Sequence, residues 1–132
     1  MRYMLTIFGD ESGREDVTPE EMKAGMQPWS EYGRQITEAG VYVAGEGLQP
    51  SATATTLRRT GESEHAVTDG PFAETKEQLG GFYLLDCANL DEALEWARKI
   101  PNQEGGSVEV RPVMDYEQYG YEDPAAQVEA AS

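Results

Sequence analysis

Apolar residues recur along this chain in short runs that are typical of β-strands. Residues 2–8 (RYMLTIF) and 81–87 (GFYLLDC) are apolar at both alternating sets of positions, and residues 107–113 (SVEVRPV) carry Val108 and Val110 on one side. A strand that is apolar on both faces is covered on both faces. The pattern therefore predicts a sheet in which at least two strands need cover on each side.

Two stretches with apolar residues at helical spacing carry start and stop signals. In the first, Thr18 is the expected N-cap, with Pro19 in the first turn and Glu21 at the capping-box position; Gly40 ends the helix. Pro28 inside this stretch predicts a kink or break near residues 25–28. Its apolar positions near helical spacing are Met22, Met26, Trp29, Ile36 and Ala39, and of these the tryptophan and the methionines are expected in the core.

The second helix is predicted to begin after Asn89 as N-cap, with Glu92 at the capping-box position, and to end before Pro101. Between the helices lie shorter strand patterns at residues 41–44, 52–59 and 64–68, with a turn-rich connector at 45–51 and a hairpin turn at 60–63. The resulting order is β-α-β-β-β-β-α-β.

This order favours one α+β domain of ferredoxin-like type, with an inserted β-hairpin and two helices on one sheet face. The other face also carries apolar side chains that must be shielded from water. A second copy of the same sheet would shield them, so we expect a homodimer through a sheet face.

Composition excludes some functions. The 132 residues suffice for one domain, and 39% hydrophobic with 27% charged residues is an ordinary globular balance. The formal net charge of −15 makes nucleic-acid or membrane partners unfavourable. Cys87 is the only cysteine and reads as a buried apolar filler, and no signal-peptide core or long apolar run is present, so we expect a cytoplasmic protein. No residue spacing indicates a metal site or a bound cofactor.

The stretch 69-DGPFAETKEQLGGF-82 is the most distinctive motif. We expect Asp69 to bond backbone N–H groups, with Gly70 and Pro71 completing a rigid turn and Phe72 burying its ring to anchor it. Gly80-Gly81 would let the backbone pass close to another segment before the next strand begins. The charged residues of the motif, which the rigid turn would hold at the mouth of the sheet, are Glu74, Lys76 and Glu77.

Residues 69–86 resemble the signature of the YCII-related proteins of the DGPF type, and residues 46–58, 91–101 and 107–113 agree with it. The resemblance covers residues 1 to about 114 and implies a dimeric ferredoxin-like α/β-barrel fold. Residues 115–132 are left as an acidic, tyrosine-rich tail that we expect to be partly disordered. Members of this family are suspected enzymes with a pocket between sheet and helix, and some occur with sigma-factor-like regulators.

We do not expect a catalytic histidine in this chain, although one is proposed for part of the family. In the YciI-like branch a histidine on the first helix is a proposed catalytic group, and Trp29 stands at that position here. The sole histidine, His65, shares a strand face with Asp69, but four residues at about 3.3 Å each place them about 13 Å apart. A direct dyad is therefore not expected, and His65 reads as a surface residue.

Two functions remain open from the sequence. The first is a small-molecule enzyme without a dissociable cofactor, in which Asp69 is the general base and Lys76 its electrostatic partner. The alternative is a non-catalytic ligand-binding or regulatory module that answers to a partner protein; a purely structural domain is a third reading. A titratable group inside a closed apolar pocket would favour the enzyme, and an open surface would favour the binding module. The residues expected to contact a ligand are Phe72, Glu74, Glu77 and Arg111, although Arg111 could instead pair with a carboxylate of the protein.

Overall fold

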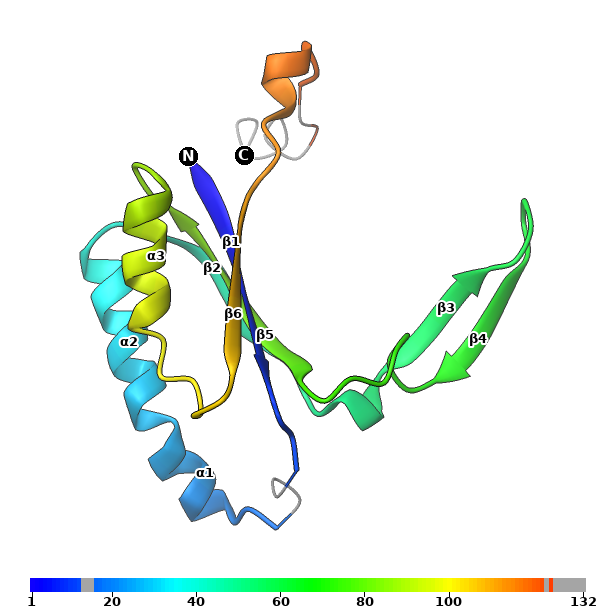
Figure 1. Cartoon of the computed structure of the whole chain (residues 1–132), viewed down its shortest axis with the longest axis horizontal. Helices are drawn as coiled ribbons and strands as arrows, with labels where there is room; N and C mark the ends of the chain where they lie inside the picture. Colours follow the sequence, from blue (N-terminus) through cyan, green and yellow to red (C-terminus); the bar gives the residue numbers. More distant parts are fainter. Residues whose placement is uncertain (13–15, 123, 125–132) are drawn as a thin grey trace.

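A four-stranded antiparallel sheet organises the molecule (Figure 1). The computed structural model describes residues 1–12, 16–122 and 124. The strand order is β2-β5-β1-β6, with β1 at Arg2–Gly9, β2 at Tyr42–Gly47, β5 at Gln78–Asp86 and β6 at Ser107–Pro112. The two central strands, β1 and β5, are those whose sequences are apolar on both faces. The chain is therefore an α+β protein with an antiparallel sheet.

One face of the sheet holds the hydrophobic core. Tyr3, Leu5 and Ile7 of β1 are buried on this face, and the register places them beside Leu85, Tyr83 and Gly81 of β5. The helices α2 (Gln27–Glu38) and α3 (Leu90–Arg98) pack over it and contribute the buried side chains of Tyr32, Ile36 and Ala93. Both helices lie on the same side of the sheet (Figure 1). This agrees with the predicted cover of one sheet face by helices.

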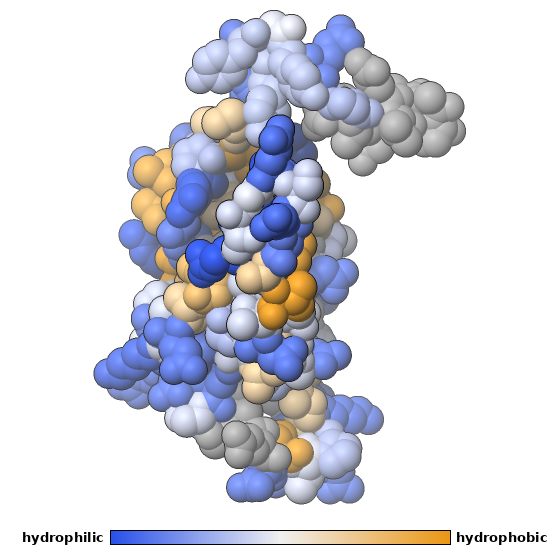
Figure 2. All heavy atoms as spheres, turned by 90° about the vertical axis from the view of Figure 1, so that its right-hand side faces the viewer, coloured by the Kyte–Doolittle hydropathy of each residue, from blue (hydrophilic) through white to orange (hydrophobic). Residues whose placement is uncertain are grey.

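Within the described residues, no helix covers the opposite face of the sheet, and we call it the open face. Its half-buried apolar side chains come from the alternate positions of β1 and β5: Met4, Phe8, Phe82 and Leu84. Figure 2 looks at the molecule from this side and shows apolar surface there beside polar residues. Apolar side chains on a sheet face without cover are the feature from which the sequence predicted a second copy.

The first helix is divided, as Pro28 predicts. The helix α1 spans Pro19–Gly25, α2 begins at Gln27, and Met26 joins them. Because proline lacks an N–H group, it is tolerated only in the first turn of a helix, and the break places Pro28 in the first turn of α2. The helix α1 buries none of its residues. Met22 and Met26 are about half exposed, so the prediction that they belong to the core is wrong.

Tyr32 is the core residue of α2 that the periodicity argument missed. Its side chain is 1% exposed, and its hydroxyl donates to the backbone oxygen of Trp96 at 2.9 Å. Its ring lies 5.1 Å from that of Tyr83 and 6.4 Å from that of Trp96, centre to centre. Tyr32 therefore joins α2 both to the sheet and to α3.

Side-chain caps fix the predicted helix starts. The Thr18 hydroxyl oxygen accepts from the N–H of Glu21 at 3.1 Å, and the Asn89 side chain accepts from the N–H of Glu92 at 2.9 Å. Glu92 in turn accepts from the N–H of Ala88, one residue before the partner expected in a capping box. Both N-caps are confirmed.

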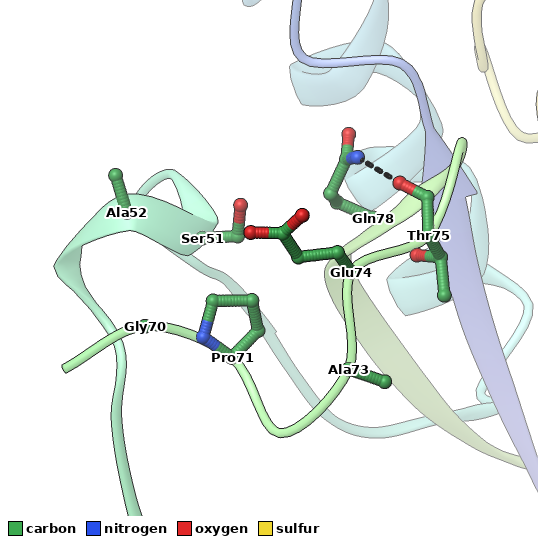
Figure 3. A pocket seen from close by; sticks show the side chains of 8 residues that line it. All are labelled: Ser51, Ala52, Gly70, Pro71, Ala73, Glu74, Thr75 and Gln78. Atoms are coloured by element: carbon green, nitrogen blue, oxygen red, sulfur yellow. Dashed lines mark hydrogen bonds between the residues drawn. The ribbon is translucent and has the colours of Figure 1, made fainter. Parts of the chain in front are cut away.

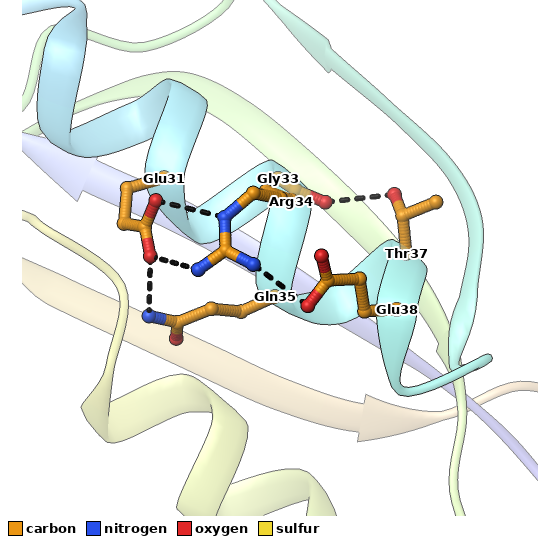
Figure 4. Close-up of polar contacts among 6 residues, drawn as sticks. All are labelled: Glu31, Gly33, Arg34, Gln35, Thr37 and Glu38. Carbon is orange, nitrogen blue, oxygen red and sulfur yellow. Dashed lines mark hydrogen bonds and ion pairs between the residues drawn. The ribbon is translucent and has the colours of Figure 1, made fainter.

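The solvent-facing side of α2 carries a small ion network (Figure 4). Arg34 lies between Glu31 and Glu38, one turn before and one turn after it, and bonds both carboxylates. Gln35 also donates to Glu31, at 3.2 Å. These hydrogen bonds, first those from Arg34, lower the pKa of Glu31 to about 2. Charge pairs at this spacing support an exposed helix.

The strands β3 (Thr55–Arg59) and β4 (His65–Asp69) form a separate two-stranded hairpin. The hairpin projects on the side of the sheet away from α2 and α3 (Figure 1). A short 3-10 helix at Ser51–Thr53 precedes it. The hairpin base is closed by the N–H of Gly70, which donates to the backbone oxygen of Ala54 at 2.7 Å. The inserted hairpin is therefore confirmed, with both strands starting later than predicted.

The paired glycines of the motif lie inside β5, two residues after its start, and not before the strand as predicted. A Cβ on Gly81 would lie 2.7 Å from the backbone oxygen of Glu46, so this position admits only glycine without a shift of β2. The expected close approach of backbone is therefore present, and the neighbour is strand β2.

The structure describes only part of residues 115–132, which were predicted to form a partly disordered tail. Tyr116–Tyr119 form a second 3-10 helix with Asp115 at its N-cap, and residues 123 and 125–132 lie outside the described residues. Over the described part of the chain, no helix has the length and apolar character needed to span a bilayer.

Candidate functional site

An apolar groove lies between two segments that are distant in the sequence. One wall is the connector after β2 together with the start of β3, and the other is the DGPF loop, which we define as residues 70–77 between β4 and β5. The groove has a volume of about 750 Å³. Phe8 and Leu79, paired across β1 and β5, extend it onto the edge of the open face. Its apolar lining consists of Phe8, Leu48, Pro50, Ala54, Pro71, Phe72, Ala73 and Leu79.

A smaller pocket of about 370 Å³ adjoins the groove and shares several lining residues with it (Figure 3). Figure 3 shows the Glu74 side chain directed across this pocket toward Ser51. The Gln78 side chain donates to the backbone oxygen of Thr75 at 2.5 Å. The two cavities form one open depression, because Ser51, Pro71 and Gln78 line both.

Contacts across long stretches of sequence hold the connector in place. The Glu11 carboxylate accepts from the N–H of Ser51 at 2.9 Å and from its hydroxyl at 2.7 Å. The N–H of Glu11 donates to the Gln78 side chain at 3.1 Å, and the N–H of Leu48 to the backbone oxygen of Gly80 at 2.8 Å. Three segments of the chain therefore meet beside the groove.

The turn into the DGPF loop is made by the backbone and a threonine. Gly70 adopts φ 103°, as predicted, and its backbone oxygen accepts from the Thr56 hydroxyl at 2.7 Å. The expected cap by Asp69 is wrong: within the described residues, no group donates to its carboxylate, and the side chain is exposed. Asp69 pairs with Thr55, so it points to the hairpin face opposite Thr56, and it does not line the groove.

Phe72 does not anchor the loop by burial, which corrects the prediction. Its side chain is 80% exposed and forms part of the groove wall. The physical reason is that the loop runs on the side of the sheet opposite α2 and α3, where none of the described elements packs over the ring. An exposed phenylalanine at the edge of an apolar depression is typical of a surface that is covered by a ligand or a partner.

The charged motif residues are divided between the two cavities. Lys76 and Glu77 line the groove, and Glu74 lines the smaller pocket. Glu77 accepts from the Ser107 hydroxyl at 3.0 Å, which directs its carboxylate toward β6. Lys76 makes no ion pair within the part of the chain that the structure describes. Lys76 is therefore the one positively charged residue that lines the groove among the described residues.

Arg111 and His65 lie away from the groove. Arg111 pairs with Glu109 on the same strand at 2.7 Å, and neither lines a cavity with the motif residues. His65 is exposed on β4, as expected for a surface residue. The structure thus brings Phe72, Lys76 and Glu77 together and leaves Asp69 and Arg111 outside.

Three groups whose pKa is raised by burial lie on the helix-covered side of the sheet. Burial raises the pKa of Tyr32, Tyr83 and the Cys87 thiol, so all three stay protonated near neutral pH. Among the described residues, no charged side chain is buried, and no three His, Cys, Asp or Glu side chains are placed to hold a metal ion. Cys87 is buried, which confirms its prediction as an apolar filler.

The connector residues are the part of the site that the motif did not reveal. Leu48, Pro50 and Ala54 form the apolar part of one wall of the groove, yet their stretch reads as a turn-rich link between strands. The available signal was the presence of apolar residues in a segment that forms no long strand of its own. Such residues need a contact elsewhere in the fold.

Comparison with known proteins adds a family and one relative. The sequence model of the YCII-related domain family matches residues 1–117 of the chain. An uncharacterized protein of Rhizobium meliloti (strain 1021) is 46% identical over 118 residues, a stretch that covers 88% of this chain and 94% of the relative. The family match agrees with the resemblance seen in the motif.

Proposed function

The chain belongs to the YCII-related domain family, and we propose that it is a non-catalytic ligand-binding module that acts as a homodimer. The observation that supports binding is the apolar groove beside the DGPF loop. Its volume of about 750 Å³ lies in the range of small-molecule sites, which are apolar with a few polar groups. The ligand is a small molecule with a substantial apolar body.

The character of the groove favours binding over catalysis. An acid–base enzyme places titratable groups where burial or neighbouring charges shift their pKa. Among the described residues, the two charged ones that line this groove are Lys76, which is exposed, and Glu77, which is half-buried. Burial raises the pKa of Tyr32 and Tyr83, but both lie on the other side of the sheet.

Catalysis by Asp69 and Lys76 stays a hypothesis, for which only one of the two residues lies at the groove. Lys76 lines the groove, whereas Asp69 points to the opposite hairpin face. A regulatory form of the binding module, in which the ligand changes contact with a partner protein such as a sigma-factor-like regulator, is compatible with the same groove.

We assign the fold as ferredoxin-like and the dimer as a barrel of two facing sheets. The strand order β2-β5-β1-β6 with both core helices on one face supports the fold assignment. The open face supports the dimer, since Met4, Phe82 and Leu84 would be buried against their copies in a two-fold interface. The groove begins at the edge of that face, so it stays accessible beside such an interface.

The test uses the uncharged fluorescent probe N-phenyl-1-naphthylamine, whose emission rises in apolar surroundings. We expect the parent to bind it, and Leu79→Asp, which adds a charge to the groove wall, to weaken binding at least about tenfold because apolar burial is lost. Leu57→Asp on the hairpin is the matched control, since Leu57 is 61% exposed and does not line the groove.

Circular dichroism and thermal melting would verify that both variants fold like the parent. Equal probe binding by the parent and Leu79→Asp, or no binding by the parent, would contradict the proposed site.

A further inference from the structure

The hydroxyl groups that line the apolar groove donate to acceptors of the protein. Ser51 donates to Glu11, Thr53 to the backbone oxygen of Pro50, and Thr56 to that of Gly70, at 2.7 Å in each case. The Thr75 hydroxyl bonds the backbone oxygen of Glu77. These groups are already satisfied, so they add little to the recognition of a polar head group.

Among the remaining polar side chains that line the groove, Gln49 is a neutral donor and Lys76 is the charged one. The Gln78 side-chain nitrogen donates to Thr75, and the Glu77 carboxylate accepts from Ser107. Lys76 is the one Lys or Arg among the described residues that line the groove, and its ammonium forms no ion pair there. Hydrogen bonding to Ser12 is the main cause that lowers the pKa of Asp10, and Lys76 lies near enough to contribute; the Asp10 and Lys76 side chains form no ion pair within the described residues.

We propose that the groove takes an amphipathic anion, with its apolar body against Phe8, Phe72 and Leu79 and its anionic head at Lys76. This inference rests on the proposed function, because it names the chemical class of the ligand for the same groove. The contact with Lys76 must be local, since the net charge of −15 repels anions at long range. An ammonium group at the rim of an apolar surface selects such a ligand over its uncharged analogue.

Two matched probes test the charge separately from the apolar contact. The probe 1-anilinonaphthalene-8-sulfonate is N-phenyl-1-naphthylamine with an added sulfonate. We expect Lys76→Gln to weaken binding of the sulfonate about fivefold in 50 mM salt, the upper end for a partly exposed ion pair. Binding of the uncharged probe should change less than about twofold. Raising the salt should reduce the difference between the parent and Lys76→Gln.

Lys23→Gln is the control, because Lys23 is exposed on α1 and lines neither cavity. Unchanged sulfonate binding in Lys76→Gln, with Leu79→Asp still weakening both probes, would overturn the anion inference and leave the proposed function standing. If Leu79→Asp affects neither probe, the groove is not the site and both proposals are wrong. If the probes bind only after Phe82→Asp separates the copies, a second copy fills the groove, and the ligand inference is overturned.

Discussion

At the residue scale, Thr56 performs the task that the motif assigned to Asp69. The Thr56 hydroxyl and the N–H of Gly70 fix the turn, whereas the Asp69 carboxylate has no donor among the described residues. A single hydroxyl can do so because the hairpin register pairs Thr55 with Asp69 and so brings Gly70, the residue after β4, close to Thr56 of β3. Within the described residues, the Asp69 side chain therefore makes no hydrogen bond that stabilises the turn.

The substitution Asp69→Asn should leave the free energy of unfolding within about 0.5 kcal/mol of the parent, as for exposed positions without a partner. Binding of N-phenyl-1-naphthylamine should also be unchanged, because Asp69 does not line the groove. Urea unfolding and probe titration would measure both. Thr56→Val is the contrasting variant: it should destabilise the loop by about 1 kcal/mol through the lost bond to Gly70. Loss of a turnover activity in Asp69→Asn, with the fold intact, would restore the catalytic hypothesis.

At the element scale, the two sides of α2 stabilise the fold by different interactions. Its buried side places Tyr32 and Ile36 in the core, and its outer side holds the Arg34 network (Figure 4). The buried side depends on packing, which is insensitive to pH. The outer side depends on charges, so its contribution changes with pH.

The pKa of Glu31, lowered to about 2 from 4.5, gives the sign of this change. A carboxylate whose pKa is lowered by folding stabilises the fold above its unfolded pKa and loses that effect as the pH falls through the folded value. The melting temperature of Arg34→Gln should therefore lie below that of the parent at pH 6, and the difference should vanish toward pH 2. Arg58→Gln, on the hairpin, is the control for loss of a positive charge. A difference that stays constant between pH 6 and pH 2 would contradict this account.

Local patterns predicted the elements well, and long-range contacts determined what they missed. The strand positions, the Thr18 and Asn89 caps and the break before Pro28 each follow from a few neighbouring residues. The burial of Phe72 was predicted wrongly because an apolar side chain indicates a need for cover and not which surface supplies it. The connector wall depends on the Glu11–Ser51 bond across 40 residues, which no local pattern encodes.

At the scale of the whole molecule, the two sides of the sheet have separate roles. The helix-covered side contains the core, and the open face, the hairpin and the groove lie on the other side (Figures 1 and 2). A single chain leaves Phe82 and Leu84 only half-buried on that face. The proposed dimer would bury them, and it would leave the groove at the edge of the interface.

Phe82→Asp should convert the proposed dimer into a monomer, because it would place two carboxylates in an apolar interface. Sedimentation equilibrium at micromolar concentration would show the halved mass. Met22→Asp, a half-exposed position on α1, should keep the parent mass. A parent that already sediments as a monomer would overturn the dimer.

The central claim is that the apolar groove beside the DGPF loop is where this protein binds its ligand. The most direct measurement is a ¹H–¹⁵N NMR titration of the parent with N-phenyl-1-naphthylamine. The account predicts that the amide shifts concentrate in residues 48–56 and 71–79, on both walls of the groove. Shifts confined to α2 and α3, or to the hairpin turn at residues 60–64, would contradict it.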